Sequence, residues 1–182
     1  MKRLLFVLTL CMVVAGNVQA DRSMRFKAQL EGFDLNGNPV ATNATGKARV
    51  EVIDDATALR FRVNVAGIKN LWMAHIHIAD MPVEVTDPAG PVAFWFTGGP
   101  PPGTTLSERV QGRLAEGYII TAGQLQLWND PDPDADGTIR GLITAIKEGR
   151  ASVIVHTNDL NPATAPGVEG DSPAGELRGT LR

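Results

Sequence analysis

The strongest constraint on the fold is a strict alternation of polar and apolar residues in several short segments. The segments that show it are 24–30, 47–52 and 59–65. Successive side chains of a β-strand point to opposite faces, so each segment has one apolar face for a core and one polar face for water. Clusters of glycine, asparagine and aspartate separate the segments, as is typical of turns. The alternation therefore predicts antiparallel sheets with one solvated face.

Other segments are apolar at almost every position, which is typical of strands in the middle of a sheet. They are 71–79, 92–96 and 153–156. A last strand is expected over 175–181. Together, these patterns predict an all-β fold, an antiparallel Greek-key β-sandwich of the immunoglobulin-like type.

Helix is expected only in the connections between strands. Over 138–149, the apolar residues at 139, 142, 143 and 146 share one helical face, and Gly149 ends the pattern. A weaker helical turn is expected after Thr121, which can cap residues 122–127. The sandwich therefore has one or two short helices.

The first 20 residues have the composition of a secretory signal peptide. A basic pair precedes an apolar stretch over 4–14, and small and polar residues lead to a cleavage site after Ala20. The apolar stretch is too short to span a membrane. The one cysteine, Cys11, follows Leu10 rather than a small residue, which disfavours a lipid anchor. We expect export to the periplasm or the medium.

The remaining chain, 21–182, is long enough for a single domain with its own core. It contains no cysteine, so packing, strand pairing or a metal must hold it together. It carries 15 basic and 20 acidic residues, a net charge of −5, and no basic stripe is visible along the sequence. We therefore expect no nucleic-acid partner, and no second apolar run reaches membrane length.

All three histidines of the chain lie in the apolar segments. His75 and His77 are two residues apart in one segment, and His156 ends another. Residues two apart share a strand face at a spacing of about 7 Å, so a neighbouring strand can bring a third imidazole to the pair. Three nitrogens suit copper, zinc, iron or nickel and leave one position open for water or substrate. The alternative is that the histidines are ordinary hydrogen-bonded sheet residues.

A metal-bound imidazole needs an acceptor for its second N–H group. Three acidic residues near the expected strand ends are candidates for this role: Asp80, Asp159 and Glu176.

An aspartate-rich loop suggests a second, weaker metal site. Asp132, Asp134 and Asp136, followed by Gly137, match the opening of a calcium-binding loop. Ile143 stands where such a loop needs a bidentate glutamate. We therefore expect calcium binding less than a stiff, solvated loop that caps the following helix.

Motifs along most of the chain resemble the CHRD domain, a family named for its repeats in chordin. They lie, in order, at 74–77, 90–92, 117–121, 142–149, 155–158 and 174–179. The resemblance implies a β-sandwich and an extracellular location, and the biochemical role of the family is undefined. Our first hypothesis is a non-catalytic binding or structural module that recognises an extracellular protein or matrix partner. The absence of a Ser/His/Asp triad, a phosphate loop or a dinucleotide motif agrees with that role. The segment 128–137 departs from the family pattern as an insertion.

The histidine pair at 75–77 is also similar to the copper-binding pair of copper,zinc superoxide dismutases. The segment 155–160 is similar to their last copper-ligand segment, and 174–178 resembles the one that carries their substrate-guiding arginine, here Arg178. This second resemblance implies a sandwich of the same type and a three-histidine copper or zinc site with Arg178 steering an anion. The bridging histidine, the other zinc ligands and the disulfide cysteines of that family are missing. The resemblance thus favours copper binding over dismutation.

Overall fold

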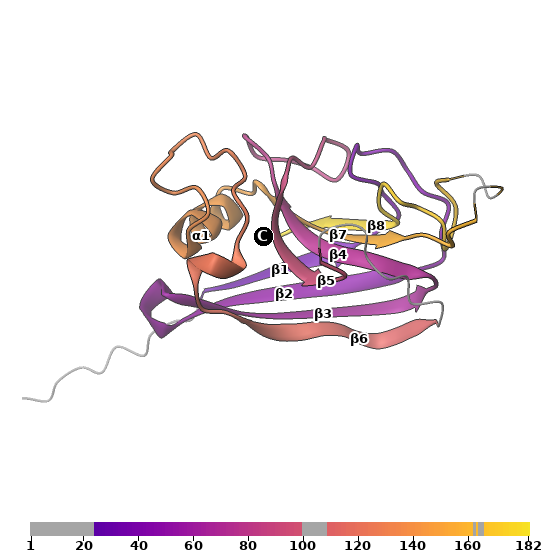
Figure 1. Cartoon of the computed structure of the whole chain (residues 1–182), viewed down its shortest axis with the longest axis horizontal. Helices are drawn as coiled ribbons and strands as arrows, with labels where there is room; N and C mark the ends of the chain where they lie inside the picture. The colour runs from indigo at the N-terminus through magenta and orange to yellow at the C-terminus, as the bar shows by residue number, and fades with distance from the viewer. Residues whose placement is uncertain (1–23, 100–108, 162, 164–165) are drawn as a thin grey trace, which may run out of the picture.

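The computed structural model describes residues 24–99, 109–161, 163 and 166–182, and the predicted signal peptide lies outside them. Two four-stranded antiparallel sheets pack face to face, as the sequence predicts (Figure 1). The first sheet has the order β1-β2-β3-β6, and the second has the order β5-β4-β7-β8.

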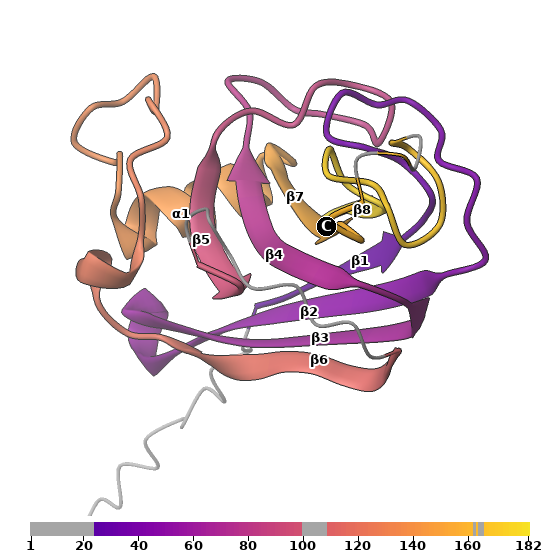
Figure 2. The ribbon, with the colours of Figure 1, turned by 45° about the vertical axis from the view of Figure 1, so that its right-hand side comes forward.

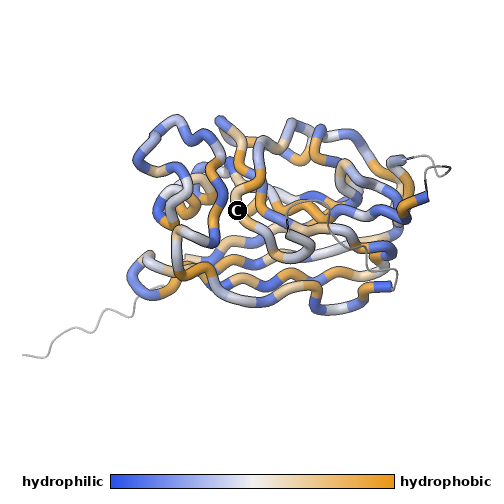
Figure 3. The backbone as a smooth tube through the Cα atoms, in the orientation of Figure 1, coloured by the Kyte–Doolittle hydropathy of each residue, from blue (hydrophilic) through white to orange (hydrophobic). Residues whose placement is uncertain are grey.

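The alternating segments form most of the first sheet, and the apolar segments form the second. The first sheet consists of β1 (Arg25–Leu30), β2 (Thr45–Ile53), β3 (Ala58–Ile68) and β6 (Val110–Ile119). The second consists of β4 (Leu71–Ile78), β5 (Val92–Thr97), β7 (Ala151–Thr157) and β8 (Leu177–Thr180). The alternation of apolar and polar residues is visible along the strands of the first sheet (Figure 3).

The connections contain the two expected helical segments, α1 (Ile139–Lys147) and the shorter η2 (Ala122–Gln124). A third, η1 (Asp54–Ala56), was not expected and lies in the turn between β2 and β3. Thr138 caps α1, since its side-chain oxygen accepts a hydrogen bond from the Gly141 amide at 3.0 Å. The buried face of α1 joins the core cluster at the end of the sandwich seen on the left of Figure 1.

Two features of the sheets differ from the sequence-based expectation. Strand β6 was not expected, because its apolar positions do not alternate cleanly; its pairing with β3, across a bulge near Val63, defines it. Gly117 of β6 fits there because a Cβ atom would lie 2.9 Å from the Phe61 ring. Strand β5 is apolar but lies at an edge of its sheet, where η2 and the chain after it partly cover it through a bridge between Phe94 and Leu125.

Backbone hydrogen bonds join the two sheets along one side of the sandwich. The amides of Lys27 and Glu31 in and after β1 donate to the carbonyls of Arg182 and Arg178, at 2.7 and 2.9 Å, and both bonds are reciprocated. The sandwich is therefore closed between β1 and β8. This closure fixes how the second sheet is placed above the first.

The second sheet is buried on both of its faces. Its inner face meets the first sheet through residues such as Ile76, Val153 and Leu177. Three loops, 31–44, 79–91 and the described residues of 158–176, lie together over the outer face (Figure 2). Main-chain hydrogen bonds link these loops: Ala89 donates to Leu35 at 2.9 Å, and Leu35 donates to Ala174 at 2.8 Å. Polar side chains on this outer face are thereby removed from water.

Candidate metal centre

The three histidines converge on the outer face of the second sheet. His75 and His77 lie on β4 and His156 on the adjacent β7, where it pairs with Met73. Directly paired residues of an antiparallel sheet point to the same side. The intervening Ile76 points into the core between the sheets, so the imidazoles point the other way, beneath the three covering loops.

The imidazole rings are close enough to share one ion. The ring centroid of His75 lies 4.7 Å from that of His77 and 4.4 Å from that of His156, and the last two are 6.1 Å apart. One nitrogen from each ring lies within 4.8 Å of the others. The three residues are 2 to 5% exposed. Among the described residues, this is the group of histidine, cysteine and acidic side chains that converges in this way.

Main-chain carbonyls fix two of the rings. His77 Nδ1 lies 2.6 Å from the carbonyl oxygen of Gly90, and His156 Nδ1 lies 2.9 Å from that of Pro173. A carbonyl oxygen only accepts, so both Nδ1 atoms donate and both Nε2 atoms keep a lone pair. Gly90 can approach β4 because it has a positive φ and no side chain; a Cβ there would lie 2.1 Å from the Ile78 carbonyl oxygen.

The remaining imidazole nitrogens are buried without a partner. Both nitrogens of His75 and the Nε2 atoms of His77 and His156 make no hydrogen bond within the described part of the chain. A buried polar atom left unsatisfied costs about 1–3 kcal/mol. A neutral imidazole has one N–H group, so three of these four nitrogens offer a lone pair and the fourth, on His75, is a donor. Three unpartnered lone pairs in one place are a donor set that a metal ion could use.

Burial keeps the three imidazoles neutral. It lowers the pKa of His156 to about 4, against the partly opposing hydrogen bond to Pro173. Burial also lowers the pKa of His77, and it lowers the pKa of His75 most strongly, with the neighbouring His156 and His77 adding to the effect. Neutral imidazole is the form that binds metal ions.

Trp95 forms part of the wall of the centre, and the sequence patterns gave it no role. Its ring meets that of His75 edge-on at a centroid distance of 4.5 Å. Its Nε1–H group is buried without a hydrogen-bond acceptor among the described residues. The β4–β5 register, in which His75 pairs with Trp95, produces this contact, and a lone sequence contains no signal of that register.

Arg178 lies near the centre but does not reach solvent. It is 0% exposed, and its guanidinium donates to the carbonyl oxygens of Val85 and Asp87 and, at 3.4 Å, to the Ser152 hydroxyl. Its positive charge contributes to the lowered pKa of His77, after burial. In this position Arg178 anchors the 79–91 loop over the histidines. The role of steering an anion from solvent does not fit a side chain so placed.

The acidic residues considered as partners of the imidazoles lie elsewhere. Glu176 is fully buried and accepts hydrogen bonds from the hydroxyls of Thr42 and Thr157 and the amide of Gly170, at 2.6 to 2.7 Å. It thus ties two covering loops to β7. Asp159 accepts from the amide of Asn161 at 2.7 Å, and Asp80 is exposed. The partners of His77 and His156 are carbonyls instead, which no side-chain pattern reveals.

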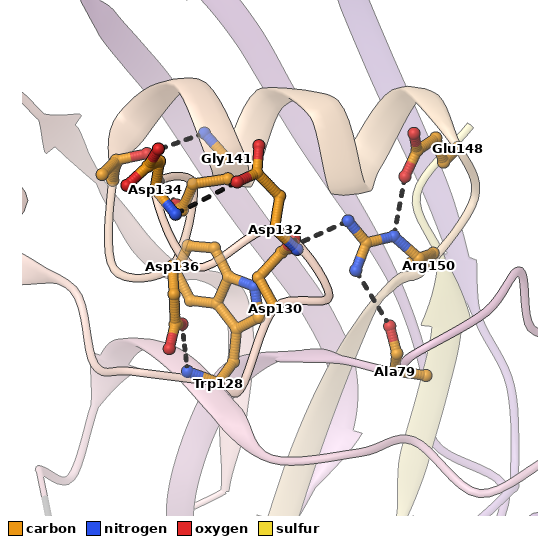
Figure 4. A network of polar contacts seen from close by, with 11 residues as sticks. Ala79, Trp128, Asp130, Asp132, Asp134, Asp136, Gly141, Glu148 and Arg150 are labelled. Atoms are coloured by element: carbon orange, nitrogen blue, oxygen red, sulfur yellow. Dashed lines mark hydrogen bonds and ion pairs between the residues drawn. The ribbon is translucent and has the colours of Figure 1, made fainter.

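The aspartates of the 128–137 loop stabilise the loop itself (Figure 4). Asp132 accepts from the amide of Asp134 at 3.1 Å, and Asp136 accepts from the amide of Trp128 at 2.7 Å. Together with Asp134, these carboxylates do not form one of the convergent groups found among the described residues. The geometry is that of a capped loop in front of α1.

Beside that loop lies an ion-pair cluster, which we call the arginine cluster: Arg150, Asp130, Glu148 and Trp128 (Figure 4). The side chains of Arg150, Asp130 and Trp128 are buried, and that of Glu148 is exposed. Arg150 binds Asp130 at 2.9 Å and Glu148 at 2.8 Å, and it donates to the Ala79 carbonyl oxygen at 3.2 Å. Asp130 also accepts from the Trp128 indole at 2.9 Å. Burial alone raises the pKa of Asp130, but the hydrogen bonds that it accepts outweigh burial and hold that pKa below its usual value.

The CHRD domain model matches residues 26–165, a span that includes all three histidines. The chain belongs to the CHRD domain family. The match covers β1 to β7 and ends before β8, which completes the second sheet. No curated protein and no solved structure matches the chain. The similarity to superoxide dismutases therefore rests only on the short sequence motifs. In the part of the CHRD chain that the structure describes, every helix is too short or too polar to cross a membrane.

Proposed function

We propose that this CHRD protein is exported and binds one copper ion through His75, His77 and His156. The observation that carries the proposal is the convergence of three buried imidazoles: one nitrogen of each ring lies within 4.8 Å of the others, and each ring has at least one nitrogen without a partner among the described residues. Two of the rings are already oriented by carbonyl oxygens, as metal-binding histidines commonly are. The centre is therefore preorganised, and binding requires little rearrangement.

The charge of the surroundings favours Cu⁺ over a divalent ion. Three neutral imidazoles supply no negative charge, and the convergent group contains no carboxylate. The guanidinium of Arg178 adds a positive charge nearby. The cost of burying an ion rises with the square of its charge, so this centre holds a monovalent ion at a smaller cost than Zn²⁺ or Cu²⁺.

Metal analysis of the purified protein tests the proposal directly. We expect about one equivalent of copper per chain when the protein is loaded with Cu⁺ and passed over a desalting column, and Zn²⁺ should not displace it. The His75→Leu variant should bind copper at least a hundredfold more weakly, because it loses one of three ligands without enlarging the site.

Ile154→Val is the matched control for this experiment. Ile154 pairs directly with His75 on the same buried face but has no ligand atom, so copper affinity should stay within about twofold. Equal copper retention by His75→Leu, or no affinity of the folded protein for copper, would contradict the proposal. The protein would then be a CHRD module whose histidines only pack.

A further inference from the structure

The outer face of the first sheet collects positive charge that the sequence scatters over separate strands. An open hollow of about 730 Å³ on this face is lined by six basic side chains and two carboxylates, a net charge of four positive. The whole chain has a net charge of −3. A basic face on an acidic protein is a local feature that needs its own explanation. No basic stripe was expected, because β1, β2 and β3 each contribute only two of these basic residues, at alternate positions.

Strand register places like charges directly opposite one another. Lys27 of β1 pairs with Arg49 of β2, and Arg49 pairs with Arg62 of β3. Neighbouring strands are about 4.8 Å apart, and like charges in such pairs destabilise a sheet. This arrangement has a cost in the free protein that a bound anion would remove.

The carboxylates of the face do not neutralise it. Glu51 forms ion pairs with Arg25 and Arg60, and Glu116 forms ion pairs with Arg62 and Arg113. Of the six basic side chains that line the hollow, three on β1 and β2 form no ion pair with the described residues: Lys27, Lys47 and Arg49. All three are exposed to solvent. They can therefore bind an external anion without first breaking a contact.

The other side chains of the face indicate the kind of anion. Gln29 and Asn64 flank Lys47 in one row of the sheet, and their amides can both donate to and accept from hydroxyl groups. Tyr118, 53% exposed and paired with Arg60, offers a flat amphipathic ring at the edge. A single aromatic is a poor platform for stacked bases, and the face lacks the aliphatic side chains that insert into membranes.

We propose that the outer face of the first sheet binds a linear polysaccharide that carries carboxylate or sulfate groups. Lys27, Lys47 and Arg49 contact the anionic groups, while Gln29, Asn64 and Tyr118 contact the sugar rings and hydroxyls. The histidines lie on the other sheet, on the face turned away from this one, so the two sites are independent. This inference does not rest on copper binding.

Binding of defined polymers to the whole protein tests the proposal. The probes are polygalacturonate for carboxylates, dextran sulfate for sulfates and neutral dextran as the uncharged control. We expect binding to one or both anionic polymers and none to dextran. Affinity should fall by more than tenfold between about 50 and 200 mM salt, since each contact releases a counterion.

A pair of charge-matched variants separates this face from net charge. Lys27→Gln/Arg49→Gln removes two charges from the face and should weaken binding on the order of tenfold. Arg140→Gln/Lys147→Gln removes two charges from the exposed side of α1 and should change the affinity for the polymer less than twofold. Copper affinity, measured on both variants, should match that of the parent protein, and the melting temperature of Lys27→Gln/Arg49→Gln should not fall below that of the parent, because the substitutions also relieve the like-charge pairs.

Three outcomes would overturn the proposal. The first is no binding to either anionic polymer at low salt. The second is an equal loss of affinity in both double variants, which would mean attraction to overall charge. The third is tighter binding to phosphatidylglycerol vesicles or single-stranded DNA than to the polysaccharides, which would assign the face to another class of partner.

Discussion

The CHRD domain buries two polar clusters, and they differ in how completely their atoms are paired. In the arginine cluster, Arg150 and Asp130 are nearly as inaccessible as any core residue, yet each makes several hydrogen bonds or ion pairs. In the histidine centre, four imidazole nitrogens have no partner in the described structure. Both clusters lie under loops that cover the second sheet or its end.

The difference separates a structural role from a binding role. Burial of a polar group is tolerated when its hydrogen bonds are made, as in the arginine cluster. Burial of several unmade hydrogen bonds in one place costs stability, and a fold retains it where something is bound. On this criterion, the arginine cluster holds the 128–137 loop against α1, and the histidine centre is where we propose that a ligand binds.

The largest expected effect is a loss of stability when the arginine cluster is broken. Replacing Arg150 with methionine keeps an unbranched apolar stem but removes the guanidinium, and it leaves the buried Asp130 carboxylate without its cation. Breaking one side of a buried ion pair costs about 3–5 kcal/mol. Urea denaturation of Arg150→Met should show a loss of this size. The double variant Arg150→Met/Asp130→Asn should recover part of it, and a loss below about 1 kcal/mol in the single variant would mean that the cluster is not structural.

Copper should act on the other cluster alone. At a free concentration a hundred times its Kd, a ligand of the folded state adds about 2.7 kcal/mol of stability. For a chain of this size, that raises the Tm by roughly 5–10 °C. Arg150→Met should show the same shift from a lower starting Tm, since separate sites add. If copper left the Tm of the parent protein unchanged, or shifted the Tm of His75→Leu equally, the histidine centre would not be a copper site distinct from the structural arginine cluster.

A smaller gain in stability is expected from His75→Leu in the absence of metal. Both nitrogens of His75 are buried and unpartnered, so an apolar side chain of similar size should raise the free energy of unfolding by about 1 kcal/mol. His77→Leu is the control: it also removes the hydrogen bond to Gly90 and should not stabilise the protein. A loss of stability in His75→Leu would show that the imidazole is structural there.

Calcium should have the smallest effect. The carboxylates of Asp132 and Asp136 already accept hydrogen bonds from amides of their own loop. We expect 5 mM calcium to change the free energy of unfolding by less than about 0.5 kcal/mol, within the range of ordinary surface effects. A thermal unfolding scan with a magnesium control measures this change. A rise in Tm that is specific to calcium would show that the 128–137 loop binds calcium.

The sequence-based predictions of the strands are confirmed where local chemistry decided them. Alternation identified β1, β2 and β3, and apolar runs identified β4, β5 and β7, because burial imposes those patterns directly. Strand β6 was missed, since its pattern is weak and its place depends on pairing with β3. The sequence also could not predict that β5 lies at the edge of its sheet, because an apolar segment indicates burial but not how many strands pair with it.

The amino-acid sequence by itself determined which residues of this CHRD protein could bind a metal. It has three histidines, all in apolar segments, and in one of those segments the spacing of His75 and His77 fixes the face that they share. Only the tertiary structure decided that β4 and β7 are neighbours, that carbonyls of two covering loops orient His77 and His156, and that the basic residues of β1, β2 and β3 share one face. The physical reason is that side-chain periodicity is local, whereas register and loop placement arise from contacts between residues far apart in the chain.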